Sequence, residues 1–173
     1  MSPARCARSS GPRTSCHGHF VSAETQVRDL QEAASQLRVP LVIGRANTEA
    51  EIDAAYATFV HQGAGALQVC ASPFFQIRQE QLLLLASRHV IPTIYDRREF
   101  TEAGGLMSYG TSLADTYRQL GVYAGRILKG EAPSDLPVVQ LSRFEFVINL
   151  KAANALGLTI PPTLLARADE VIE

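Results

Sequence analysis

The chain has 173 residues, of which 46% are hydrophobic and 19% charged, a composition typical of one globular domain of ordinary size. Its 16 basic and 17 acidic residues give a formal net charge of -1, so the charge does not favour nucleic acid or an anionic membrane surface as a partner. Apolar runs such as Leu82 to Ala86 are far shorter than the roughly 20 residues of a membrane-spanning helix, which argues against membrane insertion.

The first twenty residues differ in composition from the rest of the chain. They contain arginine, serine, glycine and proline, but no acidic residue and no periodic apolar pattern, so we predict that residues 1–20 are disordered. Cys16, His17 and His19 are metal-ligand types, but a structural zinc site needs four ligands and a supporting fold, so no metal is expected. The segment also lacks the apolar region of a secretory signal, which predicts a cytoplasmic chain if it is made as it stands.

From Ser22 onward, helical and strand patterns alternate. An amphipathic helix precedes the strand "VPLVIG", and Thr48 with Glu51 three residues later is typical of the start of a second helix, which ends at Gly63. The strand "GALQVC", the helix "FQIRQEQLLLLASRHV" and the strand "IPTIYD" follow. Strands separated by helices of this length are parallel neighbours, so the predicted class is α/β, with helices covering a parallel sheet.

The second part of the chain continues with a strand "LMSY" and a long helix from about Leu113 to Lys129, ended by Gly130. After the linker "EAPSDLP", the run "FEFVIN" predicts a last strand, Asn149 caps a helix, and a short terminal helix follows two prolines. Six residues are expected on central strands, buried on both faces: Leu67, Val69, Ile91, Ile94, Val147 and Ile148.

Known catalytic and cofactor motifs are incomplete in this sequence. Gly63-Ala64-Gly65 closes a helix instead of opening one after a strand, and no phosphate-binding loop is present, so no cofactor is predicted. Ser108 has Gly110 after it but Leu106 before it, which is half of the esterase turn. A serine hydrolase using Ser108, with His89 and Asp96 as partners, is therefore a weaker alternative, and we expect a protein that is not an enzyme.

Polar and aromatic residues follow three of the predicted strands. Ligands of open parallel sheets bind outside the carboxyl ends of the strands, so these residues are expected to face one common edge. Aromatic rings would hold an apolar ligand body, Asp96 an ammonium group, and the helix starts after Ser72 and Gly110 a carboxylate. The predicted ligand-binding residues are Ser72, Phe74, Tyr95, Asp96, Ser108, Tyr109 and Gly110.

Each of these residues also has a purely structural explanation. Phe74 and the neighbouring Phe75 could belong to the core, Asp96 could pair with Arg97 or Arg98, and Ser108 could be an ordinary turn residue. The ligand hypothesis depends on the set as a whole, because α/β sheets place their binding sites at this edge.

Three stretches carry a resemblance to a known family. They are "GLMSYG" at Gly105 to Gly110, Lys129-Gly130, and "FEFVINL" at Phe144 to Leu150 followed by Lys151. From about residue 22 to its end, the sequence resembles the C-terminal portion of ABC-transporter substrate-binding proteins, in the family that includes tryptophan- and tyrosine-binding members.

The resemblance implies a type I periplasmic binding protein fold, in which two α/β lobes close on a small solute. Residues 21–173 would form the C-terminal lobe, with 106–130 crossing toward an N-terminal lobe that this sequence lacks. Ser108 and Tyr109 would then lie beside the cleft between the lobes, and the helix after them would have an uncovered apolar face. The implied location is the periplasm.

The resemblance predicts a substrate-binding component of an ABC uptake transporter. Its ligand would be a small organic solute such as an amino acid or an aromatic compound, and its protein partner would be a transporter permease. The alternative is a truncated fragment that keeps the fold of one lobe and has no transport role, or merely associates with other chains.

Overall fold

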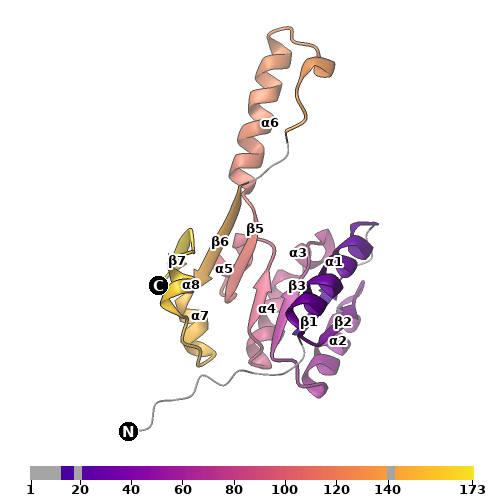
Figure 1. Ribbon diagram of the computed structural model, residues 1–173, viewed down its shortest axis with the longest axis vertical. Coiled ribbons are helices and arrows are strands. Elements are labelled where there is room, and N and C mark those ends of the chain that lie inside the picture. The colour runs from indigo at the N-terminus through magenta and orange to yellow at the C-terminus, as the bar shows by residue number, and fades with distance from the viewer. Residues whose placement is uncertain (1–12, 18–20, 140–142) are drawn as a thin grey trace.

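The computed structural model of the chain describes residues 13–17, 21–139 and 143–173. Its strands form one seven-stranded sheet in the order β2-β1-β3-β4-β5-β6-β7 (Figure 1). All neighbouring strands are parallel except β5 and β6, which are antiparallel. The strands are β1 Arg13–His17, β2 Leu41–Arg45, β3 Ala66–Val69, β4 Thr93–Tyr95, β5 Met107–Thr111, β6 Phe144–Asn149 and β7 Glu170–Ile172.

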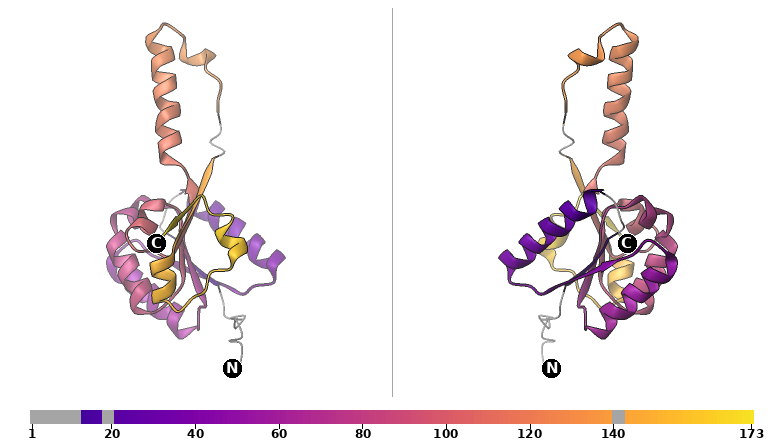
Figure 2. Two further views of the ribbon diagram at one scale, coloured as in Figure 1. Left: turned by 90° about the vertical axis from the view of Figure 1, so that its left-hand side faces the viewer. Right: turned by 90° about the vertical axis from the view of Figure 1, so that its right-hand side faces the viewer.

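Helices cover both faces of this sheet. The helices α2, α4, α5 and α7 lie on one face, and α1 and α8 lie on the other (Figure 2). The α/β class predicted from the sequence is therefore confirmed. The helices are α1 Val21–Leu37, α2 Glu49–His61, α3 Pro73–Ile77, α4 Gln79–Arg88, α5 Arg98–Glu102, α6 Leu113–Leu128, α7 Leu150–Ala155 and α8 Pro162–Leu165, and a 3-10 turn spans Pro133–Asp135.

Residues 13–17 correct the prediction that the first twenty residues are disordered. They form β1, which pairs in parallel with β2 on one side and with β3 on the other. A strand paired on both sides is held by main-chain hydrogen bonds, so it can form without an apolar pattern of its own. The rest of the predicted disordered segment, residues 1–12 and 18–20, lies outside the described residues.

The hydrophobic core lies between the sheet and the helices α2 to α5. The side chains of Tyr56 and Phe59 in α2 are almost fully buried beside Leu67, and the Tyr56 hydroxyl donates to the carbonyl of Leu82 at 3.2 Å. Each fully buried side chain of this size contributes roughly 1.5–3 kcal/mol to folding. The opposite face of the central strands is less covered.

The core prediction is confirmed for four of the six residues. Leu67, Val69, Val147 and Ile148 are buried strand residues. Ile94 is only half-buried, because its side of β4 faces an open part of the sheet between α1 and α8. A further member, Ile91, is buried but precedes β4.

Two predicted helix caps are confirmed. The Thr48 hydroxyl accepts from the Glu51 amide at 3.2 Å at the start of α2, and the Asn149 side chain caps α7. The start of α6 is capped in the same way, because the Ser112 hydroxyl accepts from the Asp115 amide. The helix predicted over "FQIRQEQLLLLASRHV" is instead divided into α3 and α4 at Arg78, where φ is -101° and ψ is 24°. Besides β1 and the 3-10 turn, α5 and β7 also have no counterpart in the sequence prediction.

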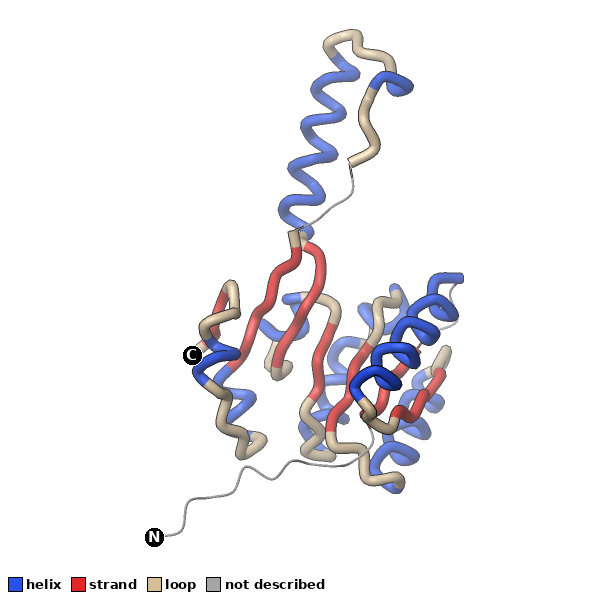
Figure 3. Tube along the Cα trace, viewed as in Figure 1, coloured by secondary structure: helices blue, strands red, loops and turns tan. Residues whose placement is uncertain are grey.

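The α6 hairpin, which consists of α6 and the 3-10 turn between β5 and β6, projects away from the sheet (Figure 3). None of the residues of α6 is buried, although the helix is amphipathic. The sequence-based expectation of a helix with an uncovered apolar face is therefore met. The large apolar side chains that α6 exposes are Tyr117, Leu120, Val122, Ile127 and Leu128.

Candidate functional site

A cavity of about 610 Å³ lies where α1, α8 and the strands β3 to β6 meet. Its floor is the part of the sheet that no helix covers, and its inner wall is formed by the carboxyl ends of β3 and β4. This is the edge at which α/β sheets place ligands. The described lining residues are Gln26, Gln68, Val69, Cys70, Ala71, Ile94, Tyr95, Asp96, Met107, Tyr109, Phe144, Phe146, Leu164, Arg167 and Asp169.

Three aromatic rings gather on the cavity side of β5 and β6. The antiparallel register places Tyr109 opposite Phe146. Side chains alternate along a strand, so Phe144, two residues away, lies on the same face. The Tyr109 ring stacks on Phe144 at 5.4 Å between centroids and meets the edge of Phe146 at 6.3 Å. Tyr109 is 54% exposed and Phe144 46% exposed, so the cluster offers aromatic surface to a ligand.

Asp96 brings a carboxylate to the inner wall of the cavity. It directly follows β4, and its side chain is 21% exposed. Burial raises the pKa of the Asp96 carboxyl above its usual value, and the nearby Arg97 guanidinium, 3.9 Å away, acts in the opposite direction. A partly buried carboxylate with one distant ion-pair partner is suited to binding a cationic group.

A turn between α8 and β7 supplies charged residues that the sequence prediction missed. Arg167 and Asp169 both line the cavity. Asp169 is bound to the main chain of Phe146 in both directions: its amide donates to the Phe146 carbonyl, and its carboxylate accepts from the Phe146 amide, each at 2.8 Å. The only sequence signal for this strand was the short run Val171-Ile172, which cannot show that it pairs with β6.

A group of ion pairs holds this turn to the rest of the sheet. The Arg98 guanidinium contacts Glu102 at 2.8 Å, Glu145 at 3.5 Å and Glu170 at 2.8 Å. These four residues come from α5, β6 and β7. Hydrogen bonding to Glu102 raises the pKa of Arg98 above its usual value, with Glu170 acting in the same direction.

The seven predicted binding residues are only partly brought together. Asp96, Tyr109 and Tyr95 line the cavity, although the Tyr95 ring is 2% exposed and stacks on Phe100 in the core at 4.5 Å. Burial raises the pKa of the Tyr95 phenol above its usual value. The described lining does not include the other four, Ser72, Phe74, Ser108 and Gly110.

These four residues have structural surroundings of their own. Ser72 is buried at the start of α3, and Phe74 packs beside Phe75 next to the core, with ring centroids 5.7 Å apart. Gly110 lies against the main chain of Asp96. The Ser108 side chain is 1% exposed and lies on the face of β5 opposite Tyr109.

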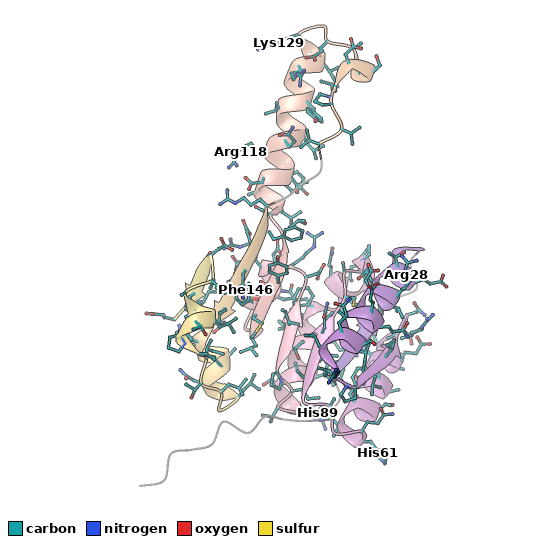
Figure 4. The ribbon with its side chains drawn as sticks, viewed as in Figure 1. Arg28, His61, His89, Arg118, Lys129 and Phe146 are labelled. Atoms are coloured by element: carbon teal, nitrogen blue, oxygen red, sulfur yellow. The ribbon has the colours of Figure 1, made fainter. Side chains whose placement is uncertain are left out.

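The geometry around Ser108 does not assemble a hydrolase triad. Among the described residues, no side chain forms a hydrogen bond with the Ser108 hydroxyl. His89 stacks on Tyr56 at the end of α4, and it lies at the opposite end of the sheet from Phe146 (Figure 4). A nucleophile needs a base within hydrogen-bonding reach, and His89 does not provide one here.

Neither a metal site nor a membrane span is found in the part of the chain that the structure describes. No group of three or more His, Cys, Asp or Glu residues there could hold a metal ion. The described helices include none that is both long and apolar enough to cross a membrane. His19 and the side chains of Cys16 and His17, the metal-ligand types noted in the sequence, are outside the described set.

A family model described as ABC transporter substrate binding protein matches residues 15–172. The chain belongs to this family. The match begins within β1, so it includes part of the segment that the sequence prediction had separated from the rest. No curated protein matches the chain.

Solved structures share the fold at low sequence identity. A conserved domain protein from Vibrio cholerae has a TM-score of 0.81 and 22% identity over 92% of this chain and 54% of its own. An ABC domain from Streptococcus pneumoniae, solved in complex with L-Trp, has a TM-score of 0.80 and 24% identity over 93% of this chain and 55% of its own. An open, ligand-free substrate binding protein with adhesive properties from Clostridium difficile has a TM-score of 0.68 and 23% identity over 94% of this chain and 54% of its own.

The chain thus spans about half the length of the structures it matches. It shares with them a mostly parallel α/β sheet flanked by helices.

Proposed function

We propose that the chain forms the solute-binding part of an ABC uptake transporter and binds a small organic solute in the cavity between α1 and α8. The observation that carries the proposal is the combination, in one cavity, of three aromatic rings with the Asp96 carboxylate. Ligand sites of this kind have mostly apolar walls with a few placed polar groups. A transporter permease is the proposed protein partner, and the proposed location is outside the cytoplasmic membrane, as for the family.

An amino acid or an aromatic compound is the proposed class of solute. The rings of Tyr109, Phe144 and Phe146 can cover an apolar or aromatic ligand body. Asp96 can bind an ammonium group, since its carboxylate is partly buried and its ion pair with Arg97 is long. The L-Trp complex of the Streptococcus pneumoniae relative supports this class without specifying the solute.

The proposal includes a second lobe that closes over the cavity. Well-formed sites bury roughly 70–90% of a ligand's surface, but here Tyr109 and Phe144 are about half exposed. The α6 hairpin projects on the same side, with an apolar face that the described residues leave uncovered. A second α/β unit that packs against α6 would cover this face and also form the opposite wall of the site.

The experiment compares the 173-residue chain with the same chain joined to the first lobe of a full-length relative. Calorimetric titration with a panel of L-amino acids and aromatic acids is expected to show weak or undetectable binding by the chain alone and clear binding by the two-lobed protein. Tight binding by the chain alone would contradict the closing lobe. Absence of binding by a well-folded two-lobed protein would contradict the solute-binding function.

A second candidate, an associating fragment without a transport role, is favoured by the exposed apolar side chains of α6. Leu120 is 56% and Leu128 88% exposed, and apolar surfaces of this kind promote association. Sedimentation of the chain alone is then expected to show a concentration-dependent increase in mass, which Leu120→Lys and Leu128→Lys would reduce. A monomeric chain would argue against this candidate.

A further inference from the structure

Arg167 is a cavity residue whose guanidinium has no ionic partner among the described residues. It lines the cavity, yet no described carboxylate lies within 4.0 Å of its guanidinium. By contrast, the Arg98 guanidinium is surrounded by three carboxylates and is not available to a ligand. Arg167 is therefore the cavity's available positive charge within the described structure.

The backbone that carries Arg167 is held firmly on both sides. The Arg167 amide donates to the Leu164 carbonyl at 3.1 Å, which continues the last turn of α8. Two residues later, Asp169 is bound to Phe146 through both its amide and its carboxylate. The next residue, Glu170, forms the ion pair with Arg98. The arginine side chain thus starts from a fixed point beside the aromatic cluster.

The surroundings of Arg167 favour a monoanionic group with an apolar body. Asp96 and Asp169 also line the cavity, so a ligand with two negative charges would meet repulsion from both. A planar carboxylate matches the two-pronged geometry of a guanidinium. The rings of Tyr109, Phe144 and Phe146 provide surface for an aromatic ring.

We infer that Arg167 binds the carboxylate of an aromatic ligand whose ring lies on Tyr109, Phe144 and Phe146. The inference rests on the proposed solute-binding function and adds to it a carboxylate requirement and the residue that imposes it. It also moves the carboxylate from the helix starts after Ser72 and Gly110, where the sequence had placed it, to the turn before β7. Neither Ser72 nor Gly110 is among the described residues that line the cavity.

Three probes of equal shape and different charge test this inference on the 173-residue chain. They are 3-phenylpropanoate, the neutral 3-phenylpropanamide and the cationic 3-phenylpropylamine. Titrations followed by ¹H–¹⁵N NMR at pH 7 report weak binding and also locate it through the amide signals of β5 and β6. The acid is expected to bind about tenfold more tightly than the amide, as a partly hydrated charge-assisted hydrogen bond would give.

The matched variants are Arg167→Gln and, as a control, Arg88→Gln. Arg88 is an exposed arginine of α4, on the other face of the sheet. Arg167→Gln should bring the acid and the amide to affinities within about twofold of each other, while Arg88→Gln should preserve the tenfold preference. The amide's own affinity should change little in either variant, which separates a lost ionic contact from a damaged cavity.

Two results would overturn the inference, and they can be told apart. Equal binding of the acid and the amide to the unmodified chain, or a preference that survives Arg167→Gln, would remove the carboxylate role and leave the cavity as a solute site. Absence of signal changes at β5 and β6 with all three probes would overturn the inference alone, since the solute-binding function is decided by the two-lobed protein.

Discussion

Gly110 lies directly against the main chain of Asp96, so closely that a Cβ on Gly110 would overlap the Asp96 carbonyl oxygen. The φ angle of Gly110 is not positive, so the glycine is needed for space and not for an unusual backbone conformation. Asp96 follows β4 and Gly110 lies near the end of β5. The close approach therefore fixes the position of the Asp96 carboxylate at the cavity wall.

Replacing Gly110 with alanine should destabilise the protein and displace Asp96. Forcing a methyl group into a filled space costs about 1–3 kcal/mol, because the backbone must shift. Urea unfolding monitored by circular dichroism gives the free energy of unfolding. Gly121→Ala is the matched control: a Cβ there meets nothing within 4 Å, and alanine favours the helix by up to about 1 kcal/mol. If both variants were equally stable, the close approach of β4 and β5 would be incorrect.

Arg98→Gln should loosen the C-terminal strand. The side chain is 35% exposed, so the loss of its contacts with Glu102, Glu145 and Glu170 should cost only about 1 kcal/mol of global stability, since water screens such pairs. The larger effect is expected locally, as faster hydrogen exchange at the amides of β7.

Arg118→Gln provides the comparison for Arg98→Gln. Arg118 pairs with Asp115 on the projecting helix, where its side chain is 71% exposed. Its loss should leave exchange in β7 unchanged. Equal exchange rates in β7 for the Arg98 variant and the unmodified chain would show that the ion pairs do not hold that strand.

Much of the fold could be predicted from the sequence because local signals agreed with the tertiary structure. Thr48 and Glu51 cap a helix by contacts within a few residues, and the run "FEFVIN" forms β6, a strand paired on both sides whose last three residues are buried. By contrast, β1 has no such signal: its place between β2 and β3 depends on main-chain pairing with strands far along the chain. Composition alone therefore classed it with the segment before it.

The sequence predicted at which edge of the sheet the candidate site lies, but not which side chains line it. The carboxyl-end rule led to Asp96 and Tyr109, which do line the cavity. The rule could not show on which face of the sheet each side chain lies. The pleat of β5 places Ser108 and Tyr109 on opposite faces. Arg167 and Phe146 were missed because their roles depend on β6 turning antiparallel and on β7 pairing beside it.

In a two-lobed protein, Tyr109→Ala should weaken solute binding by on the order of 1–3 kcal/mol, the usual cost of removing a buried aromatic contact. The ring stacks on Phe144 and faces the cavity, so its loss removes ligand surface directly. Tyr109→Phe should retain most of the affinity. Calorimetric titration with the solute identified from the panel gives the difference.

Ser108→Ala is the control for Tyr109→Ala in the same strand. Ser108 is buried on the other face of β5, so its replacement should change solute affinity by less than about twofold, well under 1 kcal/mol. No hydrolytic activity should be lost, since none is expected. A large loss of affinity with Ser108→Ala, or none with Tyr109→Ala, would contradict the orientation of this strand in the site.

Asp96→Asn should make the protein more stable at neutral pH and poorer at binding a solute with an ammonium group. Burial is the main cause of the raised pKa of Asp96, so ionising this carboxyl is harder in the folded state than in the unfolded chain.

Below the ordinary carboxyl pKa of about 3.9, Asp96 is protonated in both states and does not lower the free energy of unfolding. As the pH rises from there through the raised pKa, the unfolded chain ionises first and stability falls, and above it the cost is constant. The free energies of unfolding of the Asn variant and the unmodified chain should thus agree near pH 3.5 and differ in favour of Asn at pH 7. Asp29→Asn, at an exposed position on α1, is the control for the effect of an Asp-to-Asn substitution as such. An Asp96→Asn variant that is less stable at pH 7 than at pH 3.5, relative to the unmodified chain, would mean that the charge of Asp96 stabilises the fold.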